Sequence, residues 1–129
     1  MNRFNPSSMY SERQYRKLFN SKDLQFFEVC VGESDLMIGA DKILEKEALS
    51  AVRKFRSHLE AYISNHTEFK DSLVPLVPSP GAPFIITEMC KAGFAANVGP
   101  MAAVAGAISQ LVGEELLKHA NEVIVENGG

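Results

Sequence analysis

Two segments near the end of the chain carry the residue types best suited to binding a ligand. The first runs from Gly99 to Ala107 and consists almost wholly of small residues behind a Gly-Pro pair. Gly-Pro is typical of a helix start, and small side chains let another backbone or a ligand approach closely. The first N–H groups of a helix have no internal partner and can receive an anion such as phosphate.

The second segment is Glu126 to Gly129, which follows the apolar run Val123-Ile124-Val125. We predict a strand over Glu122–Val125 that ends in a Gly-Gly turn. Only Ile108 to Glu122 separates the two segments, so we expect them to lie close together. The predicted cofactor-binding residues, which would form a pocket for a phosphate-bearing small molecule, are Gly99, Pro100, Met101, Ala102, Asn127, Gly128 and Gly129.

Each of these signals also has a purely structural interpretation. Proline is common at the first position of any helix, and alanines and glycines allow close helix packing. Asn127-Gly128 is also a common hairpin turn. The combination of the two segments at the ends of neighbouring elements is what favours a ligand site.

Familiar catalytic motifs are missing from the sequence. It contains no phosphate-binding G-x-x-x-x-G-K-[ST] or G-x-G-x-x-G loop, no H-E-x-x-H and no G-x-S-x-G. The histidines (His58, His66 and His119) are isolated along the chain, so we expect no zinc site from it. No catalytic residue can be assigned from spacing.

Composition limits the class of protein and its partners. The chain has 129 residues, 46% of them hydrophobic, with a net charge of −3. This balance gives no support for binding nucleic acid or an anionic membrane.

Cys30 and Cys90 form no C-x-x-C pair, so two reduced, packed thiols are expected. Residues 1–20 lack a signal-like apolar run and Val98–Ile108 is too short to span a bilayer, so we expect a cytoplasmic protein.

The clearest predicted element is an amphipathic helix over Lys42–Ser64, with Asp41 as its N-cap. Apolar residues recur there at steps of three and four, from Leu44 to Ile63. His58 falls at the margin of this stripe, which favours a surface histidine. The two β-rich runs before the helix, Leu24–Val31 and Asp35–Gly39, flank a glycine and predict an antiparallel hairpin on which the apolar stripe packs.

The remaining segments complete an α+β pattern. Residues 1–9 are expected to form a disordered lead. Four prolines exclude a helix or central strand from Ser72–Pro83, and the interleaved aliphatic residues predict an extended surface segment. Further expected elements are a helix over Phe84–Phe94, a small-residue helix over Pro100–Val112 that breaks at Gly113, a helical turn over Glu114–His119, and the strand Glu122–Val125.

Val98–Ile108 and Glu122–Gly129 resemble the two signature segments of an uncharacterised family related to ApbE. ApbE proteins are flavin-binding FAD:protein FMN transferases. Four upstream segments also resemble the uncharacterised family: Tyr15-Arg-Lys-Leu-Phe, Asp35-Leu-Met-Ile, Ala40-Asp-Lys and Leu44-Glu-Lys-Glu-Ala. The likeness therefore covers most of residues 10–129.

The chain departs from the ApbE enzymes themselves in three ways. The lysine of their first motif is absent after Gly99-Pro100. The aspartate that follows their Gly-Gly pair lies past Gly129. The magnesium-binding carboxylates of their C-terminal half have no counterpart. The resemblance therefore implies that residues 10–129 are the N-terminal half of an ApbE-like domain, with magnesium bound only in a complete protein.

We therefore expect a flavin- or nucleotide-binding domain, with FAD or a related molecule as cofactor and little transferase activity in this chain alone. The alternative is a non-catalytic small-molecule-binding or assembly module, which the absent lysine favours. Whether the chain is an enzyme stays open. An unfinished sheet leaves unpaired edge groups, so the expected partners are further copies of the chain or a complementary C-terminal chain.

Overall fold

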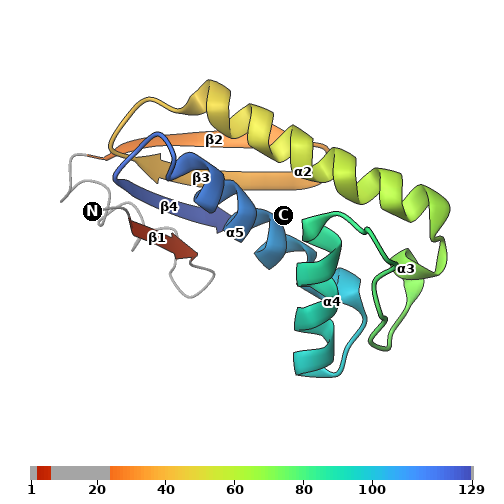
Figure 1. The fold of residues 1–129 in the computed structure, drawn as a ribbon. Coiled ribbons are helices and arrows are strands. Elements are labelled where there is room, and N and C mark those ends of the chain that lie inside the picture. The colour runs from red at the N-terminus through yellow and green to blue at the C-terminus, as the bar shows by residue number, and fades with distance from the viewer. Residues whose placement is uncertain (1–2, 7–23, 129) are drawn as a thin grey trace.

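A computed structural model describes residues 3–6 and 24–128. Its centre is a four-stranded sheet in the order β1-β4-β3-β2. Helices α2 and α5 pack against the sheet, while α3 and α4 lie to one side of it (Figure 1). The strands are β1 (Arg3–Pro6), β2 (Gln25–Val31), β3 (Ser34–Ala40) and β4 (Glu122–Asn127). The helices are α2 (Glu45–Asn65), α3 (Glu68–Asp71), α4 (Phe84–Ala96), the 3₁₀ helix η1 (Pro100–Ala103) and α5 (Val104–Leu116). The predicted α+β class is confirmed.

The predicted hairpin is formed by β2 and β3. Val31 pairs with Ser34, so Gly32 and Glu33 alone make the turn. Gly32 has a φ of 56°. A glycine with positive φ at the first central position is what a type II′ hairpin turn requires, and this turn matches the right-handed twist of the strands. Ser34, expected in the loop, is the first residue of β3.

Strand β4 lies between β3 and β1, antiparallel to the first and parallel to the second. Residues 1–9 are predicted from the sequence to form a disordered lead, whereas Arg3–Pro6 form β1. Four residues that end in proline show too little apolar alternation to indicate a strand. Strand β4 also runs two residues past the predicted end at Val125, to Asn127.

Helix α2 buries the predicted apolar stripe. Its fully or nearly buried residues are Ala48, Ala51, Val52, Phe55, Leu59 and Tyr62. They pack against β2 of the hairpin and against α5. His58 is exposed, as predicted for a surface histidine.

Asp41 is not the N-cap of this helix. Leu44 occupies that position and makes no side-chain capping bond. The Oδ1 atom of Asp41 instead accepts hydrogen bonds from the backbone N–H groups of Asn121 (3.0 Å) and Glu122 (3.2 Å). The carboxylate therefore fixes the start of β4, a partner 80 residues away that local spacing cannot reveal.

The proline-rich segment lacks helix and strand, as predicted. The predicted break at Gly113 is wrong, because α5 continues through this buried glycine to Leu116. A glycine inside a helix costs about 1 kcal/mol relative to alanine, which the packing of the apolar face of α5 offsets.

Within the described residues, no single helix has the length and apolar character needed to cross a membrane. Helices α4 and η1–α5 meet that test only as a pair, and the chain bends by 105° between them.

Candidate functional site

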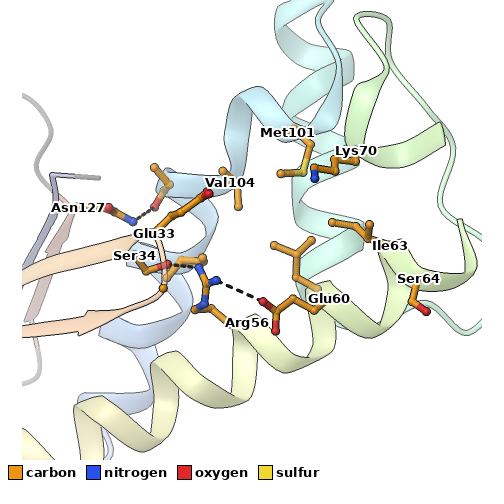
Figure 2. A pocket seen from close by; sticks show the side chains of 14 residues that line it. Glu33, Ser34, Arg56, Glu60, Ile63, Ser64, Lys70, Met101, Val104 and Asn127 are labelled. Carbon is orange, nitrogen blue, oxygen red and sulfur yellow. Dashed lines mark hydrogen bonds and ion pairs between the residues drawn. The ribbon is translucent and has the colours of Figure 1, made fainter. Parts of the chain in front are cut away.

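A pocket of about 540 Å³ lies where the hairpin turn, α2, α3 and the start of α5 meet (Figure 2). One wall is the exposed side of α2, where steps of three and four residues place Arg56, Glu60 and Ile63 on one face. The rise of a helix puts Arg56 and Ser64 about 12 Å apart along this wall. The apolar lining is formed by Leu59, Ile63, Met101, Val104, Ala105 and Ile108.

Arg56 closes the pocket at the hairpin end. Its Nη1 donates to Ser34 Oγ at 2.9 Å, and its Nη2 lies 3.3 Å from Glu60 Oε2. Ser34 is only 4% exposed, so the guanidinium supplies a hydrogen bond to a hydroxyl that water hardly reaches. A Cβ at Gly32 would overlap the same guanidinium, which means that the turn glycine also makes room for Arg56.

Lys70 lies at the opposite end of the pocket. It belongs to the single-turn helix α3 and lines the pocket together with Met101 (Figure 2). Within the described part of the chain, Lys70 makes no ion pair or hydrogen bond. The pocket therefore has one cation that is already engaged and one that is available.

The two glycine-containing segments meet, as the sequence predicts. Asn127 Nδ2 donates to the backbone oxygen of Ala105 at 3.3 Å and joins the end of β4 to α5. Of the seven predicted site residues, Met101 and Asn127 line the pocket.

The other predicted site residues are placed differently. Gly99 is buried, and a Cβ there would overlap the carbonyl oxygen of Ser72. Its missing side chain therefore allows backbone packing against the proline-rich segment. Pro100 is buried, Ala102 and Gly128 are exposed, and none of them lines the pocket. The N–H of Gly128 donates to the backbone oxygen of Asp35 (2.8 Å). Gly129 lies outside the described residues. Cofactor binding by this set stays a prediction.

Apart from Asn127, the polar residues of the pocket are not apparent from the sequence. Arg56 has no role predicted from sequence, although its side chain is only 19% exposed. The only local signal is the spacing of Arg56 and Glu60, which suits an ion pair on one helix face. No sequence pattern around Lys70 or Ser34 indicates a place in the pocket, because tertiary packing alone brings them to α2.

The thiols differ from each other. Cys90 is buried as expected, and burial raises its pKa. Cys30 is exposed, which corrects the expectation of a packed thiol. It donates to Asp35 Oδ1 at 3.2 Å, and this hydrogen bond is the main reason why its pKa is also raised. Cys30, Asp35 and Glu28 have ligand atoms within 4.8 Å of one another, but all three residues are exposed.

His66 is isolated in the sequence but not in space. Its ring stacks on Tyr62 with centroids 3.9 Å apart, and Nε2 lies 2.8 Å from Ser79 Oγ. Tyr62 Oη donates to Ser79 Oγ at 3.1 Å and accepts from the Ser79 N–H at 3.0 Å. This network fastens the proline-rich segment to the end of α2.

A family model described as AbpE bacteria matches residues 16–129. The chain belongs to this family. A UPF0280 protein of Methanococcus maripaludis is 40% identical over 110 residues, which cover 82% of this chain and 44% of that protein. UPF0280 proteins of Methanocaldococcus jannaschii and Methanopyrus kandleri are 38% and 41% identical, each over 78% of this chain and 41% of the relative. The chain thus spans less than half the length of these relatives.

Proposed function

We propose that the pocket beside α2 binds a flavin or another nucleotide. The observation that carries this proposal is a 540 Å³ cavity with apolar walls and a cation at each end. Apolar side chains suit a flat ring system, and a few polar groups at the margins suit the sugar and phosphate. The resemblance of the family to the flavin-binding ApbE enzymes adds support.

The activity of a complete family protein is proposed to be transfer of a flavin nucleotide, as in ApbE enzymes. The described residues do not fit the magnesium ion that this reaction uses. Magnesium prefers carboxylate oxygens and water in an octahedron. The exposed cluster near β2 includes a thiol, and Glu60 in the pocket is paired with Arg56. We therefore derive no catalytic step from this chain.

A non-catalytic binding or assembly module is the second candidate. The engagement of Glu60 by Arg56 favours it, because this ion pair occupies a carboxylate that lines the pocket. Association with further copies or with a chain that supplies the rest of the relatives' length is part of this proposal. Light scattering at micromolar concentration should give a mass above 14.2 kDa if copies of the chain associate, and a stable monomer would contradict association between copies.

The binding proposal is tested by titrating the chain with FMN, FAD and ADP. Flavin fluorescence and calorimetry should report saturable binding at one site per chain. Replacing Val104 by Glu, which puts a charge on the pocket wall, should abolish binding while the circular dichroism spectrum is retained. The matched control is Val77→Glu, because Val77 is 78% exposed and does not line the pocket. Equal loss in both variants, or no binding by the wild type, would refute the proposal.

A further inference from the structure

We propose that Lys70 binds the phosphate of the ligand and gives the pocket its preference for phosphorylated over neutral flavins. The inference rests on the proposed function, since it assigns a direction to the ligand in the same pocket. Lys70 belongs to α3 and lies outside both glycine-containing segments. The difference in charge between the two ends of the pocket indicates that the phosphate binds at Lys70.

The Arg56 end has no excess positive charge, because the carboxylates of Glu33 and Glu60 line the pocket together with Arg56. The guanidinium is paired with Glu60 and donates to the buried Ser34 hydroxyl. A phosphate that approached Arg56 would meet the Glu60 carboxylate, whose side chain is 65% exposed, and the two anions would repel each other. This end therefore suits the uncharged polar edge of a ring.

The Lys70 end has a positive charge that is in no ion pair among the described residues. Lys70 has no carboxylate partner within the described residues, and it lines the pocket together with the apolar Met101 (Figure 2). The ammonium group is a compact point charge with three donors, which suits a phosphate. The pocket thus binds the ring along the apolar wall of α2 and directs the phosphate to α3.

The position of Lys70 is fixed even though its side chain is exposed. The preceding residue, Phe69, is 2% exposed, and its ring meets Tyr62 edge-on with centroids 5.2 Å apart. This anchor holds α3 against the end of α2. Replacing Lys70 removes a solvent-exposed group and should leave the fold unchanged.

The test compares FMN with riboflavin, which differ only by the phosphate. Dissociation constants are measured for the wild type and for the variants Lys70→Ala and Lys70→Arg, with Lys91→Ala as a matched control. Lys91 is exposed on α4 and does not line the pocket. Lys70→Ala should weaken FMN binding about tenfold and leave riboflavin binding within about twofold, since one charged hydrogen bond is lost. Lys70→Arg should retain most of the affinity for FMN.

The outcomes separate the two proposals. Wild-type binding of both flavins with no preference for FMN, or equal weakening of both by Lys70→Ala, would overturn the role of Lys70 and leave the pocket as a flavin site. A selective loss of FMN in Lys91→Ala would also overturn it. Failure of the wild type to bind either flavin would refute the proposed function itself.

Discussion

The two sides of α2 differ in how well their environment can be predicted from the sequence. On the buried side, Ala48, Val52 and Phe55 are at most 9% exposed and form one continuous stripe. On the polar side, three neighbouring cations have different environments: Arg53 is exposed, Lys54 pairs with Glu115 on α5, and Arg56 pairs with Glu60 and Ser34. The apolar side needs only a hydrophobic neighbour, whereas each polar contact needs a particular partner. Apolar spacing therefore predicts burial, and charge alone does not predict which polar residues are engaged.

The largest effect should come from the buried side. Phe55→Ala should lower the free energy of unfolding by about 3–5 kcal/mol, because it leaves a cavity between α2 and the core. Chemical denaturation followed by circular dichroism measures this. A loss below about 1 kcal/mol would show that this part of α2 contributes little to the core.

Arg56→Ala should lower the free energy of unfolding by less than Phe55→Ala does, but by more than the substitution of an exposed residue. The buried Ser34 hydroxyl would lose its donor, which costs about 1–3 kcal/mol. The matched control is Arg53→Ala, three residues earlier and exposed, which should change the unfolding free energy by less than about 0.5 kcal/mol. Similar losses in the two variants would contradict the distinction between engaged and solvated cations.

At the end of α2, Tyr62→Phe keeps the aromatic contacts and removes only the hydroxyl. The Ser79 N–H loses its acceptor and Ser79 Oγ keeps only His66 as a partner, so we expect the free energy of unfolding to fall by about 1 kcal/mol. Limited proteolysis should then cut the proline-rich segment faster than in the wild type. Unchanged proteolysis would show that packing, and not this network, holds the segment.

The smallest effect is expected at the Lys54–Glu115 pair, and it should depend on pH. The hydrogen bond from Lys54, at 3.1 Å, lowers the pKa of Glu115. Stabilisation from a lowered pKa is present above the unfolded-state value and is lost as the pH falls through the folded-state value. Glu115→Gln should therefore cost about 0.2–1 kcal/mol near neutral pH, and the difference should shrink below about pH 4. A difference that grows on acidification would refute this assignment.

Part of the fold could be predicted because its cause is local. The stripe of α2, the hairpin around Gly32 and the proline-rich segment follow from spacing, turn geometry and the missing N–H of proline. Asp41 and Gly113 were misassigned because their partners lie elsewhere: β4 for the carboxylate, and the core for the glycine. For the candidate site, the sequence indicated the two segments that meet at Asn127 but not the polar residues opposite them.

The sequence by itself determined the α+β pattern, the buried side of α2 and the meeting of the two glycine-containing segments, because each depends on neighbours along the chain. Tertiary structure alone decided that Gly99 packs against Ser72, that Arg56 is paired, and that Lys70 is left available at the other end of the pocket. The physical reason is that a charge acquires its role from the groups within a few ångströms of it. Those groups come from α2, α3 and the hairpin, which the sequence keeps apart.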